Sequence, residues 1–288
     1  MHKEIDDKRI IDSCAECLYD KQRHLTQDRE YLAQVRKMLE ERGKEDTAPY
    51  MVYLFRQLYE QRFGKGPAYA QIKKKYNDLV LGMEETLRRK IRQAQEPLKK
   101  AFGYSRIGNY IDFGAMNDVD ENTFLALLEN GGMTDRDQEA WQSFLVQLAG
   151  AKQFLLIADN CGEIVLDKLF LECIRERFPE LKMTVMVRGA EALNDATAED
   201  AGYVGLEQVA GIVTNGCAVT GTIFSMLPDS AKTAMKNADI ILAKGQGNYE
   251  SLSGQGFHIF YSFLCKCERF TERFQVQKLA GIFVEERE

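Results

Sequence analysis

Histidine is scarce in this chain of 288 residues, which contains only His2, His24 and His258. None of them has a second histidine at metal-ligand spacing, so a zinc hydrolase of the HExxH kind is excluded. With only three histidines, a serine–histidine–aspartate triad is also disfavoured. Any catalysis is therefore expected to rest on carboxylates, amides and lysine.

Long apolar runs are missing as well. No stretch of about 18 apolar residues occurs, so no transmembrane helix is expected. The charged start MHKEIDDKRIIDSC is unlike a signal peptide. The seven cysteines are an odd number scattered along the chain, which does not match a secreted disulfide framework. We therefore expect a cytoplasmic location and no membrane contact.

Positive charge is not in excess, because the formal net charge is −6. A general nucleic-acid-binding protein needs a clustered basic surface. The basic stretches Lys73–Lys75 and Arg88–Lys90 are offset by Glu84 and Glu85 and are typical of a solvated helix face. No nucleic-acid partner is expected.

Residues 1–150 have the apolar spacing of helices. Thr26 is predicted to cap a helix that ends near Gly43, and Thr47 with Pro49 is predicted to begin the next. A capping box formed by Thr134 and Asp137 is predicted to begin the last helix of this half. We expect residues 1–150 to form a helical domain that contributes to a substrate pocket.

Residues 151–288 alternate short apolar runs with amphipathic helical pieces. This alternation predicts parallel β–α–β units and an open α/β sheet covered on both faces. The runs expected to be strands are 153–158, 183–187, 209–213, 239–243 and 257–264.

Polar side chains follow these predicted strands where ligands bind in open α/β sheets. Asp159 and Asn160 follow the first strand, and Asp195 comes shortly after the second. Two carboxylates and an amide oxygen suit Mg²⁺ or Mn²⁺, with coordination positions left for water and phosphate. Lys244, in a glycine-rich frame after the fourth strand, is expected to reach a phosphoryl group.

Gly162 is expected to let the backbone approach a ligand closely, and the helix that follows it to offer free N–H groups to an anion. Each motif also has an ordinary structural interpretation. Asp159-Asn160 and Asn194-Asp195 are typical of turns and helix caps, and Lys244–Asn248 of a plain glycine-rich loop. Only their joint placement at the strand ends favours a site.

Three segments resemble, in order and spacing, the signatures of the DUF89 family. They are DNCGEIVLD, VRGAEALNDATAED and AKGQGNYESL. These proteins are metal-dependent damage-control phosphatases, related to proteins named acidic-residue methyltransferase-like. IGNYIDFGAM at 107–116 and FYSFLCKC near the C-terminus also resemble family elements. The resemblance spans nearly the whole chain and is greatest to the compact prokaryotic members.

The resemblance implies a Rossmann-like α/β domain at 151–288 joined to the helical part. It implies metal ligands at Asp159, Asn160 and Asp195, a phosphate-binding lysine at Lys244, and a divalent cofactor such as Mg, Mn, Co or Ni. Where the family usually has alanine, this chain has Cys161. Further residues expected at the substrate pocket are Asn109, Asp112, Glu163, Arg188, Asn194 and Asn248.

Two of these positions have alternatives. Glu163 and Asp167 are one helical turn apart, so one is expected to face the pocket and Asp167 to be solvated. A structural salt bridge is as good an interpretation of Arg188 as a phosphate contact.

Four cysteines, Cys14, Cys17, Cys265 and Cys267, either form a thiolate metal site or are free thiols, and the weak spacing favours free thiols.

The favoured function is a divalent-metal-dependent phosphatase that hydrolyses phosphate esters of small metabolites by metal-activated water. One alternative is an S-adenosylmethionine-dependent carboxyl methyltransferase, disfavoured because DNCGE has one glycine. Another is a non-catalytic module that binds a sugar phosphate or nucleotide. The expected partner is a small phosphorylated metabolite.

Overall fold

The N-terminal half of the chain is helical in a computed structural model, which describes residues 9–66, 68–112 and 120–287. The 3₁₀ segment η1, Asp135–Asp137, precedes the last helix of this half. The α-helices are α1 Asp12–Leu25, α2 Arg29–Glu40, α3 Ala48–Phe63, α4 Ala70–Arg92, α5 Pro97–Gly108, α6 Glu121–Asn130 and α7 Gln138–Gly150.

Two of the predicted helix starts are confirmed. The Thr47 side chain accepts a hydrogen bond from the backbone N–H of Tyr50 at the start of α3. Thr134 and Asp137 form the predicted capping box before α7.

The predicted bounds of the helix between Thr26 and Gly43 are wrong. Thr26 ends α1, and Asp28 instead caps α2 by accepting from the N–H of Tyr31 at 2.8 Å. A carboxylate competes well for that position because the helix dipole favours negative charge there. The C-cap of α2 is Glu41, two residues before Gly43.

The C-terminal half contains an open six-stranded sheet with the order β3-β2-β1-β4-β5-β6. All five predicted strands are confirmed. Four neighbouring pairs are parallel, and β6 runs antiparallel to β5. β6 is not among the predicted strands, because its apolar run is short and two glutamates end it. The strands are β1 Gln153–Ile157, β2 Lys182–Val187, β3 Gly211–Thr214, β4 Ile240–Lys244, β5 Ile259–Leu264 and β6 Gly281–Glu286.

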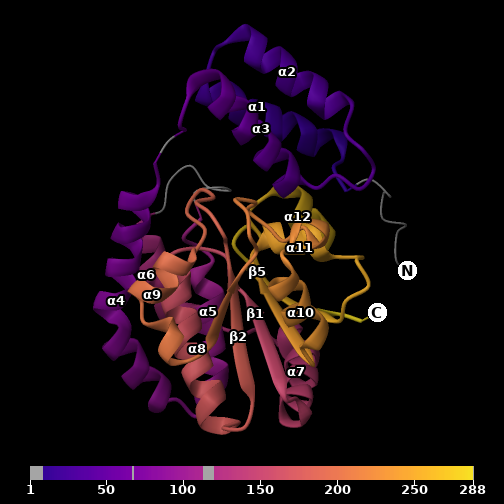
Figure 1. The fold of residues 1–288 in the computed structure, drawn as a ribbon. Helices are drawn as coiled ribbons and strands as arrows, with labels where there is room; N and C mark the ends of the chain where they lie inside the picture. Colours follow the sequence, from indigo (N-terminus) through magenta and orange to yellow (C-terminus); the bar gives the residue numbers. More distant parts are fainter. Residues whose placement is uncertain (1–8, 67, 113–119, 288) are drawn as a thin grey trace.

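Helices cover both faces of this sheet (Figure 1). Because side chains alternate along a strand, Phe154 and Leu156 join one hydrophobic core, while Leu155 and Ile157 join the other. The first core includes residues of α4, α5, α7 and α8, and the second includes residues of α10, α11 and α12. The helices of this half are α8 Glu163–Arg177, α9 Ala198–Tyr203, α10 Asp229–Asn237, α11 Gln246–Leu252 and α12 Glu268–Phe274, with 3₁₀ segments η2 Leu206–Gln208 and η3 Phe224–Met226. The predicted Rossmann-like α/β class is confirmed.

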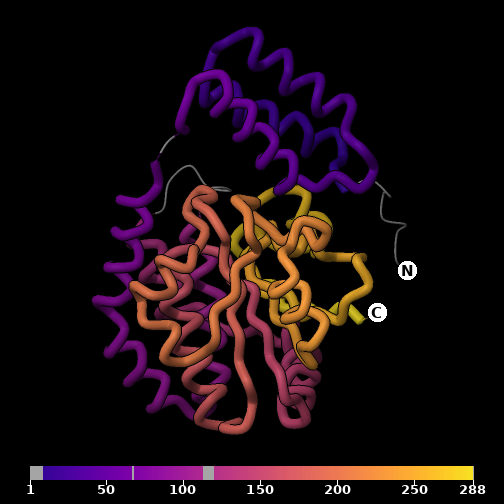
Figure 2. Tube along the Cα trace, in the orientation of Figure 1, coloured from indigo at the N-terminus to yellow at the C-terminus, as the bar shows by residue number. Residues whose placement is uncertain are grey.

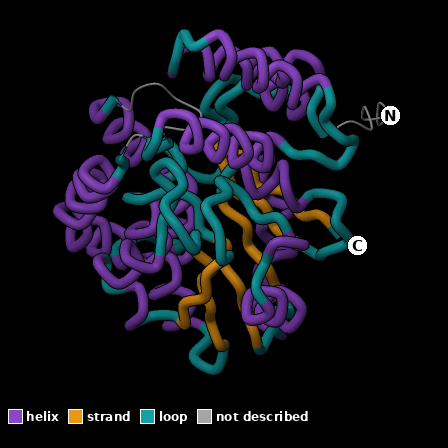
Figure 3. The backbone as a smooth tube through the Cα atoms, turned by 45° about the horizontal axis from the view of Figure 1, so that its top comes forward, coloured by secondary structure: helices purple, strands orange, loops and turns teal. Residues whose placement is uncertain are grey.

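Helices α1–α3 have a hydrophobic core of their own. Figure 2 shows them (indigo) above the loops at one end of the sheet, and Figure 3 shows these loops (teal) gathered over the strands. Pro49 of α3 lies beside Gly221, in the loop after β3, and beside Gly247 at the start of α11. Helices α4 and α5 pack on α8 instead. The division into two domains near residue 150 stays a prediction. No helix in the described part of the chain has both the length and the apolar character of a membrane span.

Candidate active site

The candidate site lies where the strand order reverses, between β1 and β4. Ligands of doubly wound sheets bind at this switch point, outside the carboxyl ends of the strands. Asp159 and Asn160 follow β1, and α8 begins at Glu163 after Gly162. Gly162 has φ +71°, a left-handed conformation that favours glycine. The turn therefore brings two polar side chains to the strand end and starts a helix at once.

The loop after β2 folds back onto this turn. Asn160 and Asp195 form an antiparallel backbone bridge. The N–H of Cys161 donates to the Asn194 carbonyl at 2.8 Å, and the N–H of Ala196 donates to the Asp159 carbonyl at 2.8 Å. Backbone hydrogen bonds thus place the three predicted metal ligands, Asp159, Asn160 and Asp195, in one cluster.

Asp159 is the centre of this cluster and is only 6% exposed. Its Oδ2 accepts hydrogen bonds from the side-chain amides of Asn109, at 2.8 Å, and Asn160, at 2.7 Å. Its Oδ1 lies 3.6 Å from Nη2 of Arg188. The predicted pocket residue Asn109, from the end of α5, therefore contacts the predicted metal ligand directly.

Arg188 is fully buried and links the two carboxylates. Its Nε donates to Asp195 Oδ2 at 2.6 Å, and its Nη1 donates to the Gly221 carbonyl at 3.0 Å. Its Nη2, facing Asp159, is buried without a hydrogen-bond partner among the described residues. The structural salt bridge is thus present, and one donor remains available beside Asp159.

Two further predicted pocket residues have protein partners. Asn194 donates to the Ile111 carbonyl at 2.9 Å and to Asn160 Oδ1 at 3.0 Å. Asn248 donates to the Lys244 carbonyl at 2.7 Å, and its oxygen accepts from Thr222 Oγ1 at 2.9 Å. Both residues fix the site loops in this structure, and their direct contact with a substrate stays a prediction.

Lys244 has a different environment from the one expected. It is the last residue of β4, its side chain is fully buried, and its Nζ contacts Glu163 Oε1 at 2.6 Å and Asp167 Oδ1 at 2.7 Å. It also donates to the Ser105 carbonyl at 3.0 Å. An ammonium group has three donors, and these acceptors occupy all three. This lysine does not extend from a flexible loop, because the strand and its partners hold it.

Glu163 and Asp167 are both fully buried, so the expectation that Asp167 is solvated is wrong. The reason is that α8 packs directly on α5 and turns both residues toward Lys244. Glu163 Oε2 also accepts from Asn109 and Asn160. Burial raises the pKa of Asp167 to about 6, against the lowering effect of Lys244. Burial lowers the pKa of Lys244, but Asp167 and Glu163 outweigh it and the pKa rises.

The start of α8 does not offer the free N–H groups that were expected. The N–H of Gly162 donates to Asn77 Oδ1 at 2.6 Å. The next three, on Glu163, Ile164 and Val165, donate to backbone carbonyls within the turn. An anion at this position would have to displace one of these bonds, so other groups must bind it.

The electrostatics of the cluster favour a cation. Burial raises the pKa of Asp159 well above its ordinary value, and Asp195, Glu163 and Asp112 raise it further. Burial also raises the pKa of Asp195 to about 6, although Arg188 opposes the shift. Crowded buried carboxylates of this kind gain from a hard cation, and oxygen donors suit Mg²⁺ or Mn²⁺. The residues therefore fit a divalent metal.

Lys266 is a residue of this region to which the sequence reading gave no role. Its Nζ contacts Asp112 Oδ2 at 2.6 Å, and its charge lowers the pKa of Asp159. Its backbone N–H donates to Gln246 Oε1. The signal was present, because Lys266 follows the carboxyl end of β5. Residues 113–116 of the predicted segment 107–116 lie outside the described residues.

The seven cysteines are free thiols. Cys265 is buried, whereas Cys17 is exposed on α1. Among the described residues, no three or more His, Cys, Asp or Glu side chains are grouped as a metal site. The three predicted metal ligands are not such a group, because one of them, Asn160, is an amide.

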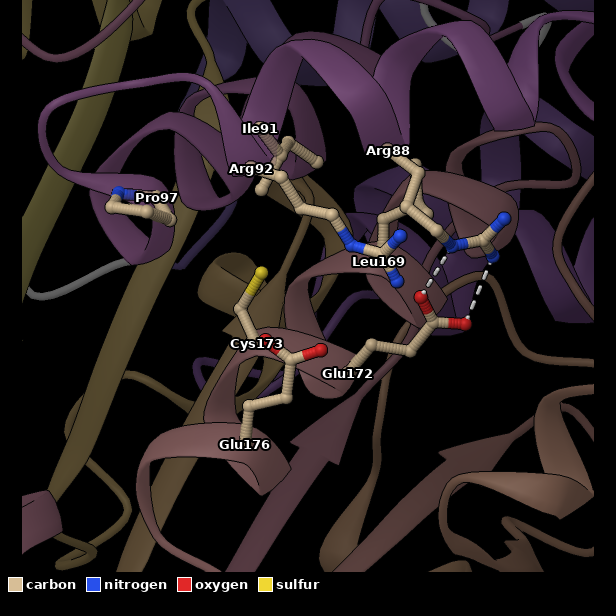
Figure 4. A pocket seen from close by; sticks show the side chains of 8 residues that line it. All are labelled: Arg88, Ile91, Arg92, Pro97, Leu169, Glu172, Cys173 and Glu176. Atoms are coloured by element: carbon tan, nitrogen blue, oxygen red, sulfur yellow. Dashed lines mark hydrogen bonds and ion pairs between the residues drawn. The ribbon is translucent and has the colours of Figure 1, made fainter.

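A separate hollow lies at the other end of α8 (Figure 4). Its volume is about 170 Å³, and Glu172 in its wall is held by Arg88. It contains none of the cluster residues. Its lining residues are Arg88, Ile91, Arg92, Pro97, Leu169, Glu172, Cys173 and Glu176.

Comparisons with known proteins show the family of this chain. A protein of Archaeoglobus fulgidus named damage-control phosphatase is 32% identical over 75% of this chain and 74% of its own. One of Pyrococcus horikoshii, named damage-control phosphatase PH1575, is 27% identical over 84% of this chain and 83% of its own. The crystal structure of a DUF89 family protein from P. horikoshii has a TM-score of 0.78 and 24% identity, covering 99% of this chain and 100% of that one. The model of the damage-control phosphatase ARMT1-like domain matches residues 8–280. The chain therefore belongs to the damage-control phosphatase ARMT1-like family, known as DUF89.

Proposed function

We propose that this protein is a divalent-metal-dependent phosphatase that hydrolyses phosphate esters of small metabolites. The observation that carries the proposal is the convergence of Asp159, Asn160 and Asp195 at the switch point of the sheet. The relatives named damage-control phosphatase support the reaction class. Sugar phosphates and damaged phosphometabolites are the substrates that we consider first.

Asp159, Asn160 and Asp195 would hold the metal. When bound there, Mg²⁺, Mn²⁺, Co²⁺ or Ni²⁺ would polarise the phosphorus–oxygen bonds and lower the pKa of water. Arg188 holds one carboxylate through Nε and points Nη2 at the other, so it fixes the spacing of the two. Asn109 and Asn194 orient Asp159 and Asn160 by hydrogen bonds.

Lys266 is our candidate for the cation that binds the transferred phosphate. It lies close enough to Asp159 to affect its pKa, and it contacts a carboxylate, Asp112, that a phosphate can replace. Lys244 has the positioning role instead. It neutralises Glu163 and Asp167, and Glu163 in turn accepts hydrogen bonds from the amides of Asn109 and Asn160 that contact Asp159. The mechanism requires no covalent phosphoenzyme.

The test is phosphate release from p-nitrophenyl phosphate by purified, metal-stripped protein with each of the four metals added separately. We expect release only with added metal, and none from Asp159→Ala. Release that persists in the stripped protein or in the variant would refute the metal centre. Binding without turnover would indicate a non-catalytic module. A screen of phosphorylated metabolites then identifies the substrate.

Two smaller inferences accompany this function. The partner that we propose is a small phosphorylated molecule, since no basic surface for nucleic acid is expected from the net charge of −6. The cytoplasm is the proposed location, because the free thiols suit a reducing compartment.

A further inference from the structure

A buried polar network beside the predicted metal ligands connects α4 to both loops that carry them. Asn77 of α4 accepts the hydrogen bond from the N–H of Gly162, in the turn that holds Asp159 and Asn160. Its side-chain amide donates to Asp200 Oδ1 at 2.9 Å. Asn77 is 1% exposed and Asp200 is 7% exposed, so water competes little for these bonds.

The other oxygen of Asp200 holds the second loop. The backbone N–H and the Oγ1 of Thr197 donate to Asp200 Oδ2 at 2.9 Å and 2.7 Å. Thr197 comes two residues after Asp195 and forms a parallel backbone bridge with Arg188, the residue that binds Asp195. Asp200 therefore fixes the segment that presents one metal ligand and its partner arginine.

The negative charge of Asp200 is balanced within the network. Lys73 Nζ lies 2.5 Å from Asp200 Oδ2, and it also donates to Thr197 Oγ1 at 3.4 Å. Lys73 and Asn77 are one turn apart on α4, so a single helix supplies both groups. Because a carboxylate has two acceptor oxygens, Asp200 can hold Thr197 with one and Asn77 with the other, which an amide cannot do with its one oxygen.

We propose that Asp200, acting with Asn77 and Lys73, is a positioning residue that sets the distance between Asp159 and Asp195 for metal binding. This inference rests on the proposed metal centre. Asp200 acts indirectly on the predicted ligands: it holds Thr197 itself, and it holds Gly162 through Asn77. Helix α4 thereby becomes part of the metal centre without contributing a ligand to it.

The chain offers a matched control for Asp200. Asp137 is also the third residue of a capping box, where it accepts from the N–H of Thr134 at 2.7 Å. It is also buried and ion-paired, with Arg106 at 2.9 Å. Its box lies before α7 and not in a loop of the metal cluster. Asp137→Asn and Asp200→Asn thus each remove a charge from a capping box and from a buried ion pair, and only Asp200→Asn also affects Asn77.

The experiment measures Mn²⁺ affinity by electron paramagnetic resonance and Tm by thermal melting. We expect Asp200→Asn and Asn77→Ala to weaken Mn²⁺ binding at least about tenfold, as the loss of outer partners of metal ligands does. Asp137→Asn should lower Tm by a similar amount but leave Mn²⁺ affinity within about twofold, because distant sites act independently. The double variant Asn77→Ala/Asp200→Asn should bind Mn²⁺ no more weakly than the worse single variant.

A readout without metal separates this inference from the proposed function. In metal-stripped protein, Asn77→Ala should speed amide hydrogen exchange in residues 159–163 and 195–198 relative to Asp137→Asn. If the wild-type protein binds no Mn²⁺, the proposed function fails, and the exchange rates alone decide the positioning role. Wild-type Mn²⁺ affinity in Asp200→Asn, or unchanged exchange in both loops, would overturn the inference.

Discussion

Gly245 lies so close to Asp159 that a Cβ atom added at position 245 would be 2.0 Å from Asp159 Oδ2. Gly245 follows β4 and has φ +82°, so both its backbone and its surroundings require glycine. Gly245, directly after β4, thus leaves room for the side chain of Asp159, which follows the neighbouring strand β1. This contact exists only because β1 and β4 pair in parallel at the switch point.

We predict that Gly245→Ala displaces the Asp159 carboxylate. A shift of about 1 Å in such a group can cost about a hundredfold in rate, so phosphate release should fall at least that far. Gly256→Ala is the control, because Gly256 has a similar φ of +73° but nothing within 4 Å of its added Cβ. Steady-state kinetics and melting of both variants check this. Equal losses of rate in the two would contradict the steric explanation.

Replacing Asp159 with asparagine should separate stability from function. The neutral amide replaces a buried carboxyl group. Burial and the charges of Asp195, Glu163 and Asp112 raise the pKa of that carboxyl. In metal-free buffer at pH 7.5, Tm should therefore stay constant or rise, by roughly 2–4 °C per kcal/mol of repulsion removed. Phosphate release should be lost. A large fall of Tm in EDTA would show that the carboxylate stabilises the empty fold.

The two buried lysines should fail in different ways. Lys244→Met leaves Glu163 and Asp167 buried without their cation, which costs about 3–5 kcal/mol of unfolding free energy. Lys266→Met should retain more stability, since its partner Asp112 is partly exposed. It should lose phosphate binding, seen as a raised KM for p-nitrophenyl phosphate. Normal kinetics in Lys266→Met would remove that lysine from the mechanism.

Glu285 of β6 predicts a dependence of stability on pH away from the site. Burial raises the pKa of its carboxyl, but hydrogen bonds from Arg287, Ser143, His258 and Gln147 outweigh it and hold the pKa at about 2. Between this value and the ordinary 4.5, the unfolded chain binds the proton more readily. The contribution of Glu285 to the free energy of unfolding is thus complete above about pH 4.5 and is lost as the pH falls toward 2.

Melting curves of the wild-type protein and Glu285→Gln between pH 3 and pH 7 check this prediction. The difference in Tm between them should be largest at neutral pH and shrink on acidification, because only the wild-type protein has the titrating group. A difference that stays constant over this range would contradict the depressed pKa.

The order of elements and the identity of the cluster came from local patterns in the sequence. Alternating apolar runs predict parallel strands, and Asp159, Asn160 and Asp195 were found because strand ends converge whatever the sheet order. Their contact through the bridge of Asn160 with Asp195 agrees with that reasoning. Lys266 obeys the same rule, because it follows the carboxyl end of β5.

Tertiary structure alone decided the partners of the charged groups. No spacing indicates that Lys244 is enclosed by Glu163 and Asp167, because the enclosure depends on how closely α5 packs on α8. Likewise, Asn77 and Asp200 are 123 residues apart and meet only when α4 packs beside the sheet. The spacing of apolar residues in the sequence indicates which side of a helix or strand is buried. Which buried charges pair depends on distances between elements, and these are fixed only when the whole core has packed.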